Sequence, residues 1–187
     1  MSLIYYLIFT LLVVTSFFEF SKNERGSKIW YCAIVVLMML TAGLGYALSP
    51  DWVAYFNTFN MLGDIEWIEL DRFSEMASME KGYLSMNKVI GDLGFGFGMV
   101  TLIVAITSLI LKTSTFYKYG GLPFLVLFIY AMPNFMFEEH VHIRQGLANA
   151  IAIYSVRYII DRKLIYFLIC IVIGFQFHES IIVFVLA

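Results

Sequence analysis

An arginine followed by a glutamine, Arg144-Gln145, stands just ahead of an apolar run that begins at Gly146. A guanidinium presents a planar fork of N–H donors that binds two phosphate oxygens at once. Free backbone N–H groups at a helix start add partial positive charge. Together these groups suit a pyrophosphate. The alternative is an arginine whose side chain extends out of the apolar layer to the water interface.

A histidine lies inside the last apolar run, in the stretch Phe177-His178-Glu179-Ser180. Imidazole exchanges a proton near neutral pH, so His178 is a candidate to assist the attack of a hydroxyl group. The alternative is a histidine at a helix end that faces another loop.

Two further stretches combine a carboxylate with an aromatic ring: Asp51 precedes Tyr55 by four residues, and Glu80 precedes Tyr83 by three. A carboxylate and aromatic rings close together suit sugar binding, and the Glu80 carboxylate is a candidate to act on a substrate. Both stretches also have structural explanations. Acidic residues favour the first turn of a helix, and aromatic residues collect at membrane interfaces.

Glu138, Glu139, His140 and His142 form a run that superficially resembles a metal site. The run E-E-H-V-H lacks the i, i+4 histidine spacing of H-E-x-x-H, so we expect a solvated outer loop and no metal. The sequence also lacks a phosphate-binding loop, a dinucleotide fingerprint and a basic patch. It therefore predicts no cofactor and no nucleic-acid partner.

The composition indicates the environment of these polar groups. Of 187 residues, 61% are hydrophobic and only 14% are charged, whereas soluble domains carry about 25% charged residues. The mean hydropathy is +0.83. A chain this apolar has too little polar surface to cover a water-facing globule, and the bilayer is its natural solvent.

The spacing of apolar residues predicts an all-α fold, a polytopic transmembrane helical bundle. A straight span needs about 20 apolar residues. Apolar runs occur at residues 3–18, 29–48, 95–111, 122–137, 146–160 and 164–187. We therefore expect about six spans, and the polar interruption at residues 176–179 predicts the start of a seventh near Ser180. Residues 1–187 are treated as a single transmembrane domain.

Charges divide sharply between alternate connections. One set contains eight basic and only three acidic residues, the basic ones being Lys22, Arg25, Lys28, Lys112, Lys118, Arg157, Arg162 and Lys163. The other set contains four basic and eleven acidic residues. Because basic connections are retained in the cytoplasm, we expect the N-terminus outside. The long connection between spans two and three, residues 49–94, is then extracytoplasmic, with an amphipathic helix at residues 83–93.

The ordered set of polar stretches resembles the EpsG-type branch of the Wzy-like polysaccharide polymerases. The matching pieces are D-x-x-x-Y at residues 51–55, E-x-G-Y at 80–83, R-Q-G-L-A at 144–148 and F-H-x-S at 177–180. The resemblance implies a glycosyltransferase-type polymerase in the bacterial cytoplasmic (inner) membrane, acting in O-antigen, capsule or exopolysaccharide synthesis. A glycan on polyprenyl pyrophosphate would pass, at the outer face, to a sugar hydroxyl of another lipid-linked repeat unit.

The same resemblance implies roles for the site residues and partners for the chain. Arg144 and Gln145 would hold the pyrophosphate, and His178 would lie at or near the reaction centre. The remaining residues, Asp51, Tyr55, Glu80 and Tyr83, would shape the glycan site or supply a base. The implied partners are the polyprenyl-pyrophosphate-linked oligosaccharide, the lipid bilayer and other polysaccharide-assembly proteins.

Two departures from the family pattern leave other functions open. Family members often carry a basic residue and a glycine before the first aspartate, where this chain has Ser49-Pro50. They are also about twice as long, so the chain resembles the N-terminal part of such a protein. The alternatives are a flippase or transporter component for lipid-linked glycans, and a non-catalytic membrane subunit. Such a subunit would bind its partner through small residues spaced four apart, as at Gly94 and Gly98 or Gly146 and Ala150.

Overall fold

The computed structural model describes residues 3–45 and 49–186, and every regular element in those ranges is helical. The α-helices are α1 (Leu3–Lys22), α2 (Lys28–Gly43), α3 (Pro50–Leu62), α4 (Leu70–Ala77), α5 (Lys81–Asp92), α6 (Phe97–Tyr119), α7 (Pro123–Tyr130), α8 (Met136–His140), α9 (Ile143–Ile160) and α10 (Leu164–Phe175). Two 3-10 helices, η1 (Trp67–Glu69) and η3 (Glu179–Leu186), and a π-helical turn, η2 (Ala131–Phe135), complete the fold. The predicted all-α class is confirmed.

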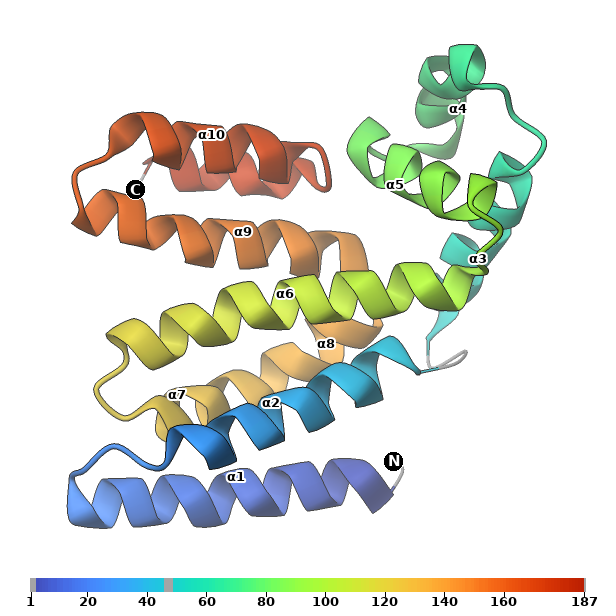
Figure 1. Ribbon diagram of the computed structural model, residues 1–187. Helices are drawn as coiled ribbons and strands as arrows, with labels where there is room; N and C mark the ends of the chain where they lie inside the picture. The colour runs from blue at the N-terminus through green and yellow to red at the C-terminus, as the bar shows by residue number, and fades with distance from the viewer. Residues whose placement is uncertain (1–2, 46–48, 187) are drawn as a thin grey trace.

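The long helices form a bundle, and the short helices α3, α4 and α5 gather at one end of it (Figure 1). Helix α6 packs against α2 on one side and α9 on the other, α10 packs on α9, and α1 packs on α7. The connections α1–α2, α6–α7 and α9–α10 all lie at the end opposite α3–α5 (Figure 1). The bundle therefore has two chemically distinct ends.

Large apolar side chains cover much of the bundle's outer surface. In α1, buried residues recur every three or four positions, at Tyr5, Ile8, Leu12, Ser16 and Glu19. The opposite face is also apolar yet exposed, with side chains such as Tyr6, Val13, Phe17 and Phe20. Helices that are apolar all round are typical of membrane spans. Helices α1 and α6 are long and apolar enough to cross a bilayer, and α2 and α10 are apolar but shorter. The count of six spans remains a prediction.

The charge partition predicted from the sequence needs one correction. Lys112 does not lie in a connection, because α6 continues to Tyr119 and Lys112 is fully buried within it. Glu138 and Glu139 belong to α8 and pair with Lys112 inside the bundle. Without these three residues the connection end opposite α3–α5 is still predominantly basic, so the sign of the asymmetry is unchanged.

The long connection between α2 and α6 is itself largely helical. The amphipathic helix expected at residues 83–93 is confirmed as α5. The third long helix begins at Phe97, because Gly94 takes a left-handed conformation (φ 83°) that separates α5 from α6. Gly94 and Gly98 therefore share no helix face, contrary to expectation. Gly146 and Ala150 do lie buried together in α9.

Two interruptions shape the second half of the bundle. The π-helical turn η2 contains Pro133 and joins α7 to α8; helices accommodate an interrupted hydrogen-bond ladder through such turns. Helix α10 ends at Phe175, and η3 then packs back against both α10 and α9. The break expected at residues 176–179 is confirmed. It places the connection between α10 and η3 beside α5.

Candidate functional site: four motifs at one end of the bundle

An ion pair joins two of the sequence motifs. Arg144 lies in the first turn of α9 and Glu80 directly precedes α5, and Arg144 Nη1 donates a short hydrogen bond to Glu80 Oε2. Both side chains are partly buried, and the two residues are 64 apart in sequence. Arg144 Nε is buried and has no acceptor in the part of the chain that the structure describes. The donors of the guanidinium are thus only partly used, which leaves capacity for an anion.

Two tyrosine rings contact the guanidinium group of Arg144. Arg144 Cζ is 5.5 Å from the ring centroid of Tyr55 and 5.8 Å from that of Tyr83, within the range of a cation–π contact. The two rings meet edge to face at 5.8 Å and are buried. Burial raises the pKa of Tyr55, which nearby Arg144 partly offsets, and burial raises the pKa of Tyr83. Both phenols are therefore neutral at physiological pH.

The connection between α10 and η3 docks on the start of α5. The Tyr83 N–H donates to the carbonyl of Gln176 at 3.1 Å, and the Glu179 N–H donates to Glu80 Oε1 at 3.2 Å. The approach requires glycine at position 82, since an added Cβ would lie 2.6 Å from the Gln176 carbonyl oxygen. Glu80 thus bridges Arg144 to the segment that carries His178.

The contacts of His178 define which ring nitrogen carries its proton. Nδ1 accepts a hydrogen bond from the Ser180 N–H at 3.2 Å and lies 2.9 Å from the Ser180 hydroxyl oxygen. A backbone N–H can only donate, so Nδ1 is unprotonated and the neutral ring carries its hydrogen on Nε2. This geometry favours a hydrogen-bond donor at Nε2 over the base suggested by the sequence.

The third motif begins at the edge of this cluster. Asp51 lies in the first turn of α3, and its Oδ2 is 3.1 Å from His142 Nδ1, with both side chains about half exposed. The Ser49 hydroxyl oxygen accepts from the Trp52 N–H at 3.2 Å, which caps α3, and its hydroxyl donates to the His140 carbonyl at 3.2 Å. The start of α3 is thereby tied to the turn that precedes α9. Gln145 follows Arg144 in that first turn and is partly buried.

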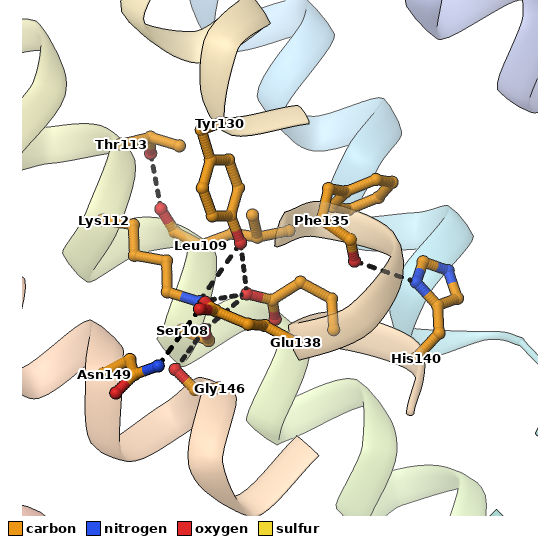
Figure 2. Close-up of polar contacts among 11 residues, drawn as sticks. Ser108, Leu109, Lys112, Thr113, Tyr130, Phe135, Glu138, His140, Gly146 and Asn149 are labelled. Carbon is orange, nitrogen blue, oxygen red and sulfur yellow. Dashed lines mark hydrogen bonds and ion pairs between the residues drawn. The ribbon is translucent and has the colours of Figure 1, made fainter. Parts of the chain in front are cut away.

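A second polar cluster was missed by sequence reasoning. The solvated outer loop expected around Glu138–His140 is wrong, because Glu139 and His140 are only 3% and 6% exposed and belong to α8. Glu139 pairs with Lys112 (Figure 2), which is 0% exposed. The sequence did hold a signal: Ser108, Lys112 and Thr115 recur at helical spacing, which marks a polar stripe along α6 rather than a connection.

A family model described as the EpsG family matches residues 28–187, a stretch that includes all four motifs. No curated protein and no solved structure matches the chain. Among residues 3–45 and 49–186, no group of three or more His, Cys, Asp or Glu side chains is arranged to hold a metal ion.

Proposed function

The chain belongs to the EpsG family of Wzy-like polysaccharide polymerases, and from that premise we propose that it extends a lipid-linked polysaccharide. A glycan passes from polyprenyl pyrophosphate to a sugar hydroxyl of a second lipid-linked repeat unit, at the outer face of the bacterial cytoplasmic membrane. One observation carries the proposal: Arg144, Glu80, Tyr55 and Tyr83 meet the segment bearing His178 at a single end of the bundle.

The proposed orientation follows from the charged ends of the bundle. The connections at the end opposite the site carry Lys22, Arg25, Lys28, Lys118, Arg162 and Lys163. Basic connections remain in the cytoplasm. This orientation puts the N-terminus outside, with about six spans between the two faces. It also puts outside the motif cluster, which consists of Arg144, Glu80, Tyr55, Tyr83 and the segment bearing His178. The site then faces the compartment in which the lipid-linked units are joined.

The pyrophosphate is assigned to Arg144, with Gln145 and the free N–H groups at the start of α9 as further donors. A guanidinium and a helix N-terminus both favour negative charge, and the guanidinium does so with fixed geometry. The buried rings of Tyr55 and Tyr83 hold the guanidinium from below.

The reaction forms a bond between the acceptor hydroxyl oxygen and the anomeric carbon as the bond from that carbon to the pyrophosphate oxygen breaks. We assign the hydroxyl proton to Asp51, whose carboxylate is half exposed. His178 donates a hydrogen bond from its Nε2–H group to the departing pyrophosphate. Glu80 is the less suitable base, since both of its oxygens already accept hydrogen bonds, from Arg144 and from the Glu179 N–H. It serves as a positioning residue.

Elongation by the purified chain in detergent micelles tests this function. The micelles are supplied with polyprenyl-pyrophosphate-linked repeat units, and product length is read on a gel. Micelles have no second leaflet, so transport across a membrane cannot produce the signal. We expect Arg144→Ala to reduce the elongation rate by about 100-fold, the typical loss on removing one charge-stabilising donor. Full-length products from Arg144→Ala would refute the assignment.

The matched control is Arg72→Ala. Arg72 is an exposed arginine of α4, in the same outer group of helices as the site. Its removal changes the net charge as Arg144→Ala does without touching the motif cluster. The elongation rate of this variant should match that of the unmodified chain.

A further inference from the structure

A pocket lies where α3 and α5 end side by side. The ring of Tyr55 in α3 meets that of Tyr83 in α5 at 5.8 Å, and farther along both helices Lys88 reaches the Leu62 carbonyl. The two helices therefore run in the same direction. The pocket encloses about 320 Å³, at the low end of the range of about 300–1,000 Å³ for ligand sites. Its lining includes Phe59, Asn60, Lys88, Gly91, Asp92 and Phe95.

The lysine of this pocket is buried yet has a spare hydrogen-bond donor. Lys88 is 6% exposed, and its Nζ donates to the Leu62 carbonyl at 3.4 Å and to Asp92 Oδ1 at 3.3 Å. Both distances exceed the range of about 2.7–3.2 Å that is usual for such bonds. An ammonium has three donors, and the described residues supply no third acceptor to this one. An oxygen of a bound ligand would satisfy the remaining donor.

Hydrogen-bond acceptors lie beside that donor. Trp67 Nε1 donates to Asp92 Oδ2 at 2.9 Å and so orients the carboxylate, whose side chain is 45% exposed. Each carboxylate oxygen accepts about two hydrogen bonds, so each has capacity left. Asn60 is exposed at the end of α3 and adds an amide, which both donates and accepts. These groups suit a ligand that also does both, as hydroxyl groups do.

The charges around the pocket favour a neutral ligand. The ammonium of Lys88 and the carboxylate of Asp92 cancel one another. Helices α3 and α5 both end here, and the partial negative charge of helix C-termini disfavours a phosphate. The ammonium disfavours a cation. The rings of Phe59 and Phe95 line the same pocket and offer apolar surface to the C–H face of a sugar ring. The lining therefore fits a neutral sugar.

A glycine keeps the pocket open. Gly91 lies inside α5, where glycine is less favourable than alanine. Its added Cβ would meet only the Phe59 ring, at an ordinary distance of 3.6 Å. The packing of the helices thus does not require glycine here, unlike at Gly82, where a Cβ would collide with Gln176. A larger side chain at position 91 would instead occupy space within the pocket.

The pocket and the motif cluster lie along the same two helices. Phe59 follows Tyr55 by one turn of α3, and Lys88 and Asp92 follow Tyr83 by five and nine residues of α5. At about 1.5 Å per residue, these two residues lie about 8 and 13 Å along α5 from Tyr83. We propose that the pocket binds a sugar of the lipid-linked glycan, beyond the sugar joined to the diphosphate. This assignment rests on the proposed function.

Binding by the purified chain in detergent tests the pocket with two ligands. Both are the same short-chain polyprenyl diphosphate, one bearing the oligosaccharide repeat unit and one without sugars. Gly91→Leu fills the pocket with a residue that favours a helix. It should weaken binding of the glycan-bearing lipid by at least about tenfold and leave binding of the sugar-free lipid unchanged. Equal affinity of Gly91→Leu and the unmodified chain for the glycan-bearing lipid would overturn the assignment.

Asn60→Ala keeps the test decisive if Gly91→Leu fails to fold. Asn60 is exposed, and alanine favours a helix over asparagine. Loss of its hydrogen bonds should weaken binding of the glycan-bearing lipid about two- to tenfold. The matched control is Asn57→Ala, at an exposed position three residues earlier in α3 and outside the pocket lining. The same affinity in Asn60→Ala and Asn57→Ala would contradict a sugar contact at position 60.

Free oligosaccharide, released from the lipid by mild acid, separates this proposal from the pyrophosphate assignment. It should bind the unmodified chain and bind Gly91→Leu and Asn60→Ala more weakly, whether or not the sugar-free diphosphate binds at the start of α9. That result without diphosphate binding would support the pocket and contradict only the proposed function. Diphosphate binding that depends on Arg144, with the glycan-bearing lipid indifferent to both variants, would overturn the pocket alone.

Discussion

Arg144 contacts residues of two other sequence motifs. It pairs with Glu80 and lies over Tyr55 and Tyr83. Sequence reasoning identified these residues individually, because a charged group beside an apolar run has few ordinary explanations. It could not predict the pairing of Arg144 with Glu80, since that contact joins residues 64 apart and depends on how α5 docks against α9.

Lys112 shows where reasoning at this scale fails. A lysine that follows an apolar run can be solvated, and then it indicates a helix end. It can also be buried within the helix, and then carboxylates must pair with it. The carboxylates of Glu138 and Glu139 reach it from α8, across the bundle. Only tertiary packing distinguishes the two cases, so both the lysine and the acidic pair were misplaced.

The ion pair between Glu80 and Arg144 should contribute to the stability of the fold. Glu80→Gln keeps an oxygen that can accept from the Glu179 N–H, but it removes the negative charge opposite Arg144. Because both side chains are partly buried, we expect a loss of about 1–2 kcal/mol in the free energy of unfolding. Denaturant unfolding in detergent measures it. Glu75→Gln, at an exposed position of α4, is the control. A loss no larger than that of the control would show that the ion pair contributes nothing.

At the scale of elements, the docking of α5 against the connection between α10 and η3 is the contact on which the site depends. The sequence predicted α5 and predicted a break at residues 176–179, because an amphipathic pattern and a polar interruption are both local signals. It did not predict that they touch. The contact is possible because Gly82 has no side chain to collide with Gln176. A backbone hydrogen bond from the Tyr83 N–H to the Gln176 carbonyl also joins the two elements.

Alanine at position 82 should therefore separate the two elements. Its Cβ would lie 2.6 Å from the Gln176 carbonyl oxygen, so either α5 or the connection must shift. We expect Gly82→Ala to cost about 1–3 kcal/mol in the free energy of unfolding, the usual cost of overpacking, and to reduce elongation as well.

The matched control is Gly98→Ala. An added Cβ at Gly98 has no described atom within 4 Å, and alanine favours a helix over glycine. Gly98→Ala should be neutral or slightly stabilising. If the two alanine variants unfold alike, the contact between α5 and Gln176 is not a constraint on the fold.

At the scale of the whole molecule, composition and charge were sufficient to predict a helical membrane bundle with two unlike ends. Those properties average over many residues, so single errors such as Lys112 did not change the outcome. The bounds of the helices were less predictable. Helix α6 continues beyond the apolar run predicted to end at residue 111 and ends at Tyr119, and a π-helical turn rather than a helix end follows α7.

Labelling in intact cells tests the predicted orientation. Cysteines are introduced singly at exposed positions, Glu24→Cys in the α1–α2 connection and Asp64→Cys after α3, in a chain with Cys32→Ser and Cys170→Ser. A membrane-impermeant maleimide should label the cysteine at position 64 and not that at position 24 until the cells are opened. The reverse pattern would place the motif cluster in the cytoplasm.

Binding of a short-chain polyprenyl diphosphate to the purified chain tests the role of Arg144 most directly, because it requires no acceptor and no turnover. Titration should show tighter binding of the diphosphate than of the matching monophosphate. Arg144→Ala should weaken diphosphate binding by at least about tenfold, the loss of one charge-assisted contact, and Arg72→Ala should leave it unchanged. Equal diphosphate affinity in the unmodified chain and Arg144→Ala would contradict a pyrophosphate site at the start of α9.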